Sequence, residues 1–109
     1  MTMNLYIKDR IYFPAIFPAK GTFSEFHLKR EIIRKIYITE EDRKKYSIKE
    51  DQASGQITWD SEKDIQEPLV VEFSEAEATF IKKCCEQLND NLYPDDFWVT
   101  IERIYSGVN

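Results

Sequence analysis

Residues 74–88, SEAEATFIKKCCEQL, and residues 94–106, PDDFWVTIERIYS, decide the fold that this sequence predicts. Ser74 and Glu77 have the spacing of a capping box, in which each side chain accepts a hydrogen bond from the other residue's backbone amide. The apolar residues behind this box recur at helical spacing, at Phe80, Ile81, Cys84, Cys85 and Leu88. Pro94 suits the first turn of a second helix with the same spacing. Two such helices joined by a short polar turn predict an antiparallel hairpin.

Upstream, three more segments have helical patterns. Residues 8–17 predict one short helix, although Pro14 weakens it because an interior proline removes a hydrogen-bond donor. Two further capping boxes, Thr22–Glu25 and Thr39–Asp42, predict a helix that ends near residue 37 and a short helical turn that ends at residue 46. We expect the apolar half of the longer helix to pack inward, and its members are Phe26, Leu28, Ile32, Ile33, Ile36 and Tyr37.

Between the helical segments, short runs rich in β-branched or aromatic residues predict strands, at residues 47–50, 56–59 and 69–73. The turn sequence DQASG links the first two runs, and residues 60–68 form the second link. Residues 3–7 also alternate, as a short strand or as an extended lead-in. The predicted fold is therefore a single α+β domain over residues 1–109. It has about four helices packed with a small antiparallel three-stranded sheet.

The composition is that of a globular protein with one core. The chain has 109 residues, of which 42% are hydrophobic and 32% charged. No apolar run approaches the length of a bilayer span, and the first residues lack the pattern of a signal peptide. The two cysteines, Cys84 and Cys85, are neighbours in a predicted helix and are poorly placed to bridge each other. We expect them to pack in the core of a protein of the reducing cytoplasm.

Charge is distributed unevenly along the chain. The net charge is −5, yet residues 20–45 carry eight Lys or Arg against five Asp or Glu, and residues 46–109 carry five against fourteen. An acidic chain is a poor generic DNA binder. The basic segment nevertheless predicts a candidate surface for phosphates or for an acidic partner, at Arg30, Arg34, Lys35, Arg43, Lys44 and Lys45. The acidic half would suit a basic target.

The usual signatures of catalysis and metal binding are missing. Lys20, Gly21 and Thr22 precede a helix, but their order is wrong for a phosphate-binding loop, and Pro18 lacks an amide that such a loop would use. His27 is the single histidine and has no zinc partners nearby in sequence. We therefore expect no catalytic, cofactor-binding or metal-binding residues, and no enzyme activity.

Most of the chain resembles a group of small proteins encoded in bacteriophage and prophage genomes. The matching pieces are IKDRIYFPAIFPAKGTF, LKREIIRKI, ITEEDRKKYSIKE, GQITWD, VEFSEAEATFIKKCCEQL and the terminal ERIYS. Residues 93–98 depart from the polar turn usual in that group. The resemblance implies a phage origin and a product of the bacterial cytoplasm, and it brings no activity and no functional residue with it.

From these observations we expect a non-enzymatic protein that acts by protein–protein contact, with a bacterial host or defence factor as the target it inhibits. The alternative is a small nucleic-acid-associated regulator. It would use the basic face of the helix at 24–37 together with residues 43–45.

Overall fold

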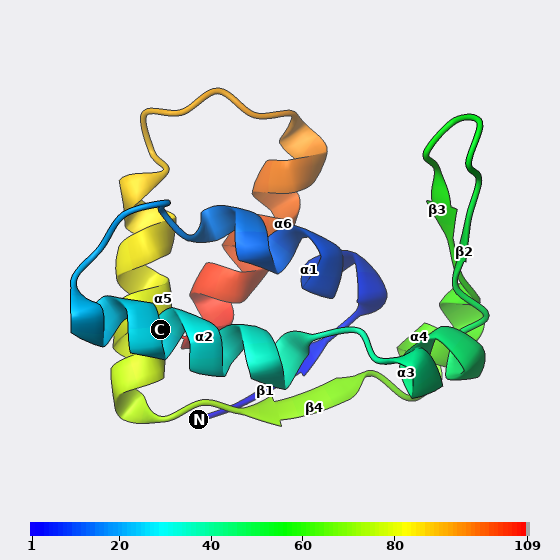
Figure 1. Cartoon of the computed structure of the whole chain (residues 1–109), viewed down its shortest axis with the longest axis horizontal. Coiled ribbons are helices and arrows are strands. Elements are labelled where there is room, and N and C mark those ends of the chain that lie inside the picture. Colours follow the sequence, from blue (N-terminus) through cyan, green and yellow to red (C-terminus); the bar gives the residue numbers. More distant parts are fainter. Residues whose placement is uncertain (109) are drawn as a thin grey trace.

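The helix hairpin predicted from residues 74–106 is present. In the computed structural model, which describes residues 1–108, α5 (Glu75–Gln87) and α6 (Asp95–Val108) run antiparallel and pack side by side (Figure 1). The Ser74 hydroxyl accepts a hydrogen bond from the Glu77 amide at 3.1 Å, and the Glu77 carboxylate accepts one from the Ser74 amide at 2.7 Å. The predicted capping box is therefore confirmed.

The part of the chain before residue 49 contains three α-helices and a 3₁₀ turn. They are α1 (Ile7–Tyr12), η1 (Phe13–Ile16), α2 (Phe23–Ile36) and α3 (Glu40–Lys45). Pro14 lies in the first turn of η1, where its missing donor is not needed, so the expected single helix over 8–17 is divided in two. Both predicted capping boxes form, at Thr22 with Glu25 and at Thr39 with Asp42.

The fold is α+β as predicted, but the three-stranded sheet was wrong. β1 (Thr2–Leu5) pairs antiparallel with β4 (Leu69–Glu72), whereas β2 (Lys49–Glu50) pairs with β3 (Ile57–Thr58) in a separate ladder. The N-terminal strand β1 pairs with β4 because Met3 and Leu5 bury their side chains on the same face of the ladder as Val71.

A helix, α4 (Ser61–Gln66), occupies the segment that we expected to link two strands. Asp60 caps it by accepting from the Lys63 amide at 3.1 Å. Lys63 stands where a capping box would have Glu or Gln, so the sequence gives a weaker signal here than at the other helix starts. Residues 1–108 thus contain six α-helices, where about four were expected.

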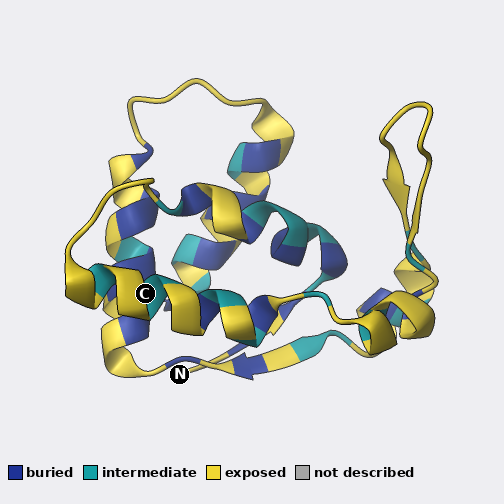
Figure 2. Cartoon of the chain, in the orientation of Figure 1, coloured by how far each residue is buried: buried dark blue, intermediate teal, exposed yellow. Residues whose placement is uncertain are grey.

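The β2–β3 hairpin stands clear of the rest of the molecule (Figure 1) and is exposed along its whole length (Figure 2). Two backbone hydrogen bonds hold its base, from Ile48 to Arg43 at 2.9 Å and from Asp60 to Tyr46 at 2.7 Å. Tyr46 itself is buried and anchors this base to the helices. Gly55, at a φ of +73°, closes the turn, which is a conformation that glycine adopts at little cost.

The core lies between the α5–α6 hairpin, the β1–β4 ladder, α2 and η1. Its fully buried members come from all of these elements, among them Leu5, Phe13, Ile32, Phe73, Ile81 and Ile104. Burial of each large apolar side chain stabilises the fold by roughly 1.5–3 kcal/mol. The core therefore depends on contacts between distant parts of the chain.

A buried guanidinium links α1 to the end of α2. Arg10 is only 4% exposed, and its Nε donates to the Ile36 carbonyl at 2.9 Å. Its Nη2 donates to the Tyr37 carbonyl and to the Asp42 carboxylate, both at 2.7 Å. Burial alone would raise the pKa of Asp42, but the hydrogen bonds from Arg10 and from the Thr39 amide lower it. Arg10 thus satisfies carbonyls at the α2 C-terminus that have no partner within the helix.

Replacement of this guanidinium tests its structural role. We expect Arg10→Met to lower the free energy of unfolding by about 3 kcal/mol, because it leaves two carbonyls without their donor and the Asp42 carboxylate without its cation. Urea unfolding at pH 7, followed by circular dichroism, measures this change. Lys44→Met, at an exposed position, is the control and should change stability by less than about 0.5 kcal/mol. Equal stability of both variants would contradict the role.

Candidate functional site

The outward face of α2 carries large aromatic side chains in water. Phe23 is 76% exposed, Phe26 45% and Tyr37, the residue after the helix, 66%. The expectation that Phe26 and Tyr37 pack inward was wrong. Only Ile32 and Ile36 of this helix are fully buried, since α2 packs against α5 and β4 along one narrow stripe. Its apolar residues outside that stripe remain partly or largely solvated.

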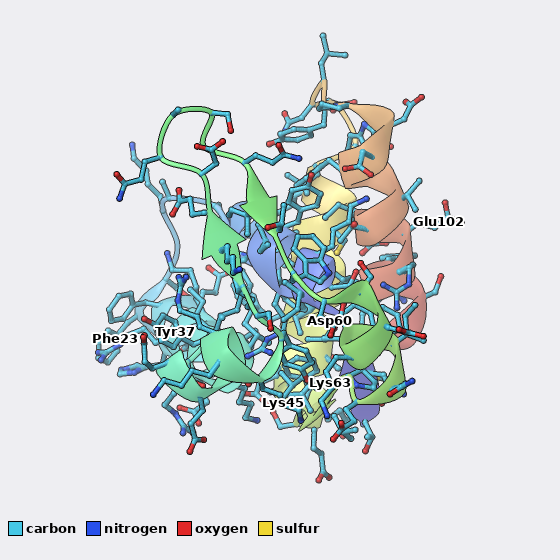
Figure 3. All side chains as sticks on the ribbon, turned by 90° about the vertical axis from the view of Figure 1, so that its right-hand side faces the viewer. Phe23, Tyr37, Lys45, Asp60, Lys63 and Glu102 are labelled. Atoms are coloured by element: carbon cyan, nitrogen blue, oxygen red, sulfur yellow. The ribbon has the colours of Figure 1, made fainter. Side chains whose placement is uncertain are left out.

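Two arginines lie between these aromatic rings. Phe23, Phe26, Arg30, Arg34 and Tyr37 follow one another at three- or four-residue steps, so that they share one side of the helix over about 20 Å. We call these five residues the aromatic–basic face. Figure 3, which looks along the molecule from the right of Figure 1, shows Phe23 and Tyr37 projecting from the same side.

Contacts with one another and with neighbouring residues of α2 hold several side chains of the aromatic–basic face. The Phe23 ring lies edge-on to the His27 ring with centroids 4.3 Å apart, and the Arg30 guanidinium lies 5.6 Å from the centroid of Phe26. Arg34 forms an ion pair with Glu31 one turn earlier. A shallow hollow of about 620 Å³ opens beside Tyr37, and Ile33 lines it together with both arginines. The face therefore offers rings, cations and a depression together.

The six basic residues proposed from the sequence do not form one free surface. Arg30, Arg34, Arg43 and Lys44 are exposed, and Lys45 lies 3.7 Å from Glu67. Lys35 has a structural role, because its Nζ donates to the buried Glu77 carboxylate at 2.6 Å and to the Glu72 carbonyl at 3.0 Å. Lys35 therefore joins α2 to α5, and the exposed arginines on α2 are those of the aromatic–basic face.

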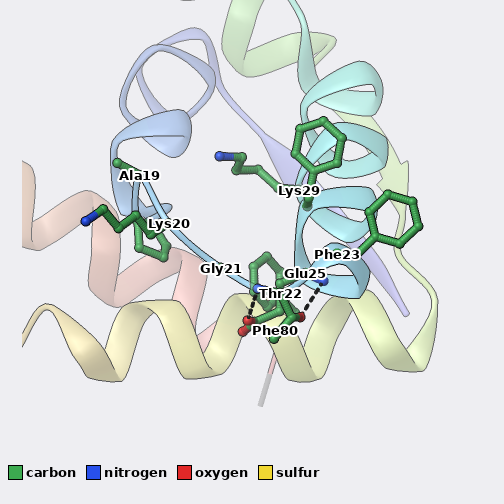
Figure 4. A pocket seen from close by; sticks show the side chains of 10 residues that line it. Ala19, Lys20, Gly21, Thr22, Phe23, Glu25, Lys29 and Phe80 are labelled. Carbon is green, nitrogen blue, oxygen red and sulfur yellow. Dashed lines mark hydrogen bonds between the residues drawn. The ribbon is translucent and has the colours of Figure 1, made fainter.

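The loop before α2 lines a cavity of about 490 Å³, but its chemistry does not suit an anion (Figure 4). The Thr22 amide donates to Glu25 Oε1 at 2.9 Å, so a carboxylate of the chain itself occupies the helix N-terminus. This backbone hydrogen bond, followed by that from Lys83, lowers the pKa of Glu25. A carboxylate held in its charged form would repel a phosphate at this position.

Two buried carboxylates, Asp9 and Asp64, also serve the fold. The Ile7 amide donates to both Asp64 oxygens at 3.1 Å, and the Tyr6 amide donates to Asp9 at 2.9 Å. Arg103 from α6 pairs with Asp9 at 2.6 Å. Burial raises the pKa of Asp64, and the hydrogen bond from Ile7 opposes the rise. Both carboxylates cap the first turn of α1, and this explains their burial without any catalytic role.

Both cysteines are buried, in agreement with the sequence prediction, and burial makes them poor nucleophiles. It raises the pKa of Cys84 to about 11 and that of Cys85 to about 12. Among residues 1–108, no three His, Cys, Asp or Glu side chains come together as a metal site would require. No helix within that range is long and apolar enough to cross a membrane.

Neither a known protein family, nor a curated protein, nor a solved structure matches this chain. The candidate site is therefore defined by its own geometry. The spacing of Phe23, Phe26, Arg30, Arg34 and Tyr37 was visible in the sequence. The sequence did not show how little of α2 is buried. Because only a narrow stripe packs inward, the exposed rings of this face lie outside the core.

Removal of the Lys35 ammonium tests whether its ion pair with Glu77 stabilises the fold. We expect Lys35→Met to lower the free energy of unfolding by about 2 kcal/mol at pH 7, because Glu77 stays buried without its cation. Burial acts to raise the pKa of Glu77, but Lys35 and the Ser74 amide hold it below its ordinary value of 4.5. The stabilisation is therefore present above pH 4.5 and disappears as the pH falls through the folded-state pKa.

Urea unfolding at pH 7 and at pH 3 measures this effect, and the difference between wild type and Lys35→Met should narrow at pH 3. Lys29→Met, at a half-buried lysine of the same helix, is the matched control. A loss of stability equal in the two variants, or independent of pH, would contradict the stabilising role of this ion pair.

The cysteines provide a test of the core. From the change in pKa alone, native Cys84 at pH 8 has a roughly 100-fold smaller thiolate fraction than an ordinary thiol. We expect both thiols to react with a disulfide reagent at least about 100-fold more slowly in the native protein than in guanidinium chloride. Stopped-flow absorbance measures both rates. Fast reaction of either thiol in the native protein would place it outside the core.

Proposed function

We propose that this protein is a non-enzymatic binding protein, and that it acts by contact of its aromatic–basic face with an acidic surface of another protein. The observation that carries the proposal is the exposure of Phe23, Phe26 and Tyr37 on one side of one helix. These rings contribute little to the core, and aromatic residues and arginine are the types that dominate the binding energy of protein interfaces.

The charge of the face favours an acidic partner. Arg30 and Arg34 present guanidinium groups that match carboxylates in a bidentate geometry. Arg34 already pairs with Glu31, which holds it at the surface and leaves its remaining N–H groups for a partner. Arg43 and Lys44 on α3 add exposed positive charge near the same end of α2. A complementary acidic surface would gain in both encounter rate and specificity.

Single-stranded nucleic acid is the second candidate. Its phosphates would contact Arg30, Arg34, Arg43 and Lys44, and its bases would stack on the exposed rings. The net charge of −5 and the acidic residues Glu31, Glu40 and Glu41 weigh against this candidate, because they repel a polyanion at the same surface.

The cellular setting proposed here follows from the resemblance to phage-encoded proteins. In that setting the protein works in the cytoplasm of an infected or lysogenic bacterium, and its partner is a host or defence factor that it inhibits by occupying an acidic site. This mode of action needs no cofactor.

A differential capture experiment tests the proposed contact. Immobilised wild-type protein and the variant Phe23→Ala/Tyr37→Ala are exposed to lysate from phage-infected bacteria, and bound proteins are quantified by mass spectrometry. We expect one protein at near-stoichiometric yield on the wild type and at least about tenfold less on the variant. Phe23→Ala and Tyr37→Ala, each made alone, should weaken the affinity of the purified protein for this partner by similar factors.

The matched control is Leu92→Ala/Val99→Ala, which removes two apolar side chains that are 98% and 58% exposed and lie outside α2. It should retain the partner, and all variants should keep stabilities within about 1 kcal/mol of wild type. Equal capture by every variant would rule out the aromatic–basic face. Salt-sensitive binding of a fluorescent oligothymidylate at about 50 mM salt, lost in Arg30→Ala/Arg34→Ala, would favour the nucleic-acid candidate instead.

A further inference from the structure

A second hollow lies on another side of the molecule, between α5 and α6. It measures about 530 Å³ and is lined by Cys85, Glu86, Asn89, Trp98, Ile101, Glu102 and Tyr105. We call it the α5–α6 groove. In Figure 3 Glu102 projects on the side opposite Phe23 and Tyr37, so this groove and the aromatic–basic face can be occupied at the same time.

The aromatic walls of the α5–α6 groove are held in place by their neighbours. The half-buried Trp98 indole lies at a steep angle to Tyr93 and Phe97, with ring centroids 5.5 Å and 6.0 Å away. The Tyr105 hydroxyl donates to Glu86 Oε2 at 3.2 Å, which connects the ring on α6 to a carboxylate on α5. Both rings are thus fixed before any ligand arrives, and this reduces the entropy lost on binding.

The charges of the groove are of one sign. Glu86 and Glu102 are both exposed, and among residues 1–108 neither forms an ion pair within 4.0 Å. Of the residues that the structure describes, no Lys, Arg or His lines the groove. Its floor is apolar, because Ile101 is buried and the neighbouring Cys85 stays a neutral thiol. The groove therefore combines two uncompensated carboxylates, two aromatic rings and an aliphatic floor.

We propose that the α5–α6 groove is a binding site for a lysine or arginine side chain in a basic segment of a partner protein. A cation on an apolar stem matches each part of it. The stem would lie on Ile101, the ammonium or guanidinium would face the rings of Trp98 and Tyr105, and the carboxylates of Glu86 and Glu102 would complete its coordination. An apolar side chain without charge would leave both carboxylates unused.

This site is independent of the aromatic–basic face and opposite to it in charge. A protein with both would contact an acidic partner through α2 and a basic segment through α5 and α6, and could hold the two together.

An NMR titration tests the groove. The probe is a synthetic peptide of alternating glycine and lysine, added to ¹⁵N-labelled protein. The protein has two tryptophans, so the indole N–H of Trp98 reports on the groove and that of Trp59 serves as an internal reference. We expect shifts at Trp98 and at backbone amides of residues 85–89 and 98–105, with little change at Trp59. A glycine–arginine peptide should give the same pattern.

The variant Glu86→Gln/Glu102→Gln should weaken binding of the lysine peptide at least about fivefold, since it keeps the shape of the groove and removes its charge. The control Glu50→Gln/Glu62→Gln alters net charge by the same amount at exposed positions elsewhere and should leave the affinity within about twofold. Equal weakening by the two variants would reduce the effect to general electrostatics and overturn the proposal. Equal binding of a glycine–norleucine peptide, or no shift at Trp98, would overturn it as well.

Discussion

The buried guanidinium of Arg10 determines how the N-terminal half of this protein is assembled. It comes from α1, it caps the end of α2 through the carbonyls of Ile36 and Tyr37, and it pairs with Asp42 at the start of α3. Three successive helices therefore meet at one side chain. The three hydrogen bonds from this buried cation leave little freedom in the angle between α2 and α3.

That constraint has a consequence for the surface. Tyr37 follows the last residue of α2, and Arg10 binds its carbonyl. Its ring is exposed and lines the same hollow as Arg34. At the other end of α2, the capping box at Thr22 fixes where the helix begins and so directs Phe23 into solvent. Polar contacts thus fix both ends of the helix that carries the exposed rings, and a partner would meet a surface that is already formed.

Local sequence signals predicted the helices well and the long-range pairing poorly. The boxes at Thr22, Thr39 and Ser74 are contained within four residues each, and all three form. The pairing of β1 with β4 joins segments more than sixty residues apart, and no local pattern shows which of several short strands is the partner. α4 was missed because its cap lacks the acidic residue of a full box. For the candidate site, the sequence indicated Arg30 and Arg34, but the pairing of Lys35 with Glu77 and the exposure of Phe26 depend on tertiary packing.

The β2–β3 hairpin is supported at its base alone, by Tyr46 and the backbone bonds of Ile48 and Asp60. Residues 51–56 touch neither the core nor the α5–α6 groove, and the hairpin rises away from the helices in Figure 1. An insertion at such a tip lowers the stability of the fold only through the closure entropy of a longer loop, which grows slowly with loop length. The tip at Ala53 and Ser54 is therefore a natural position for a fluorescent label or an affinity tag that leaves both proposed binding surfaces open.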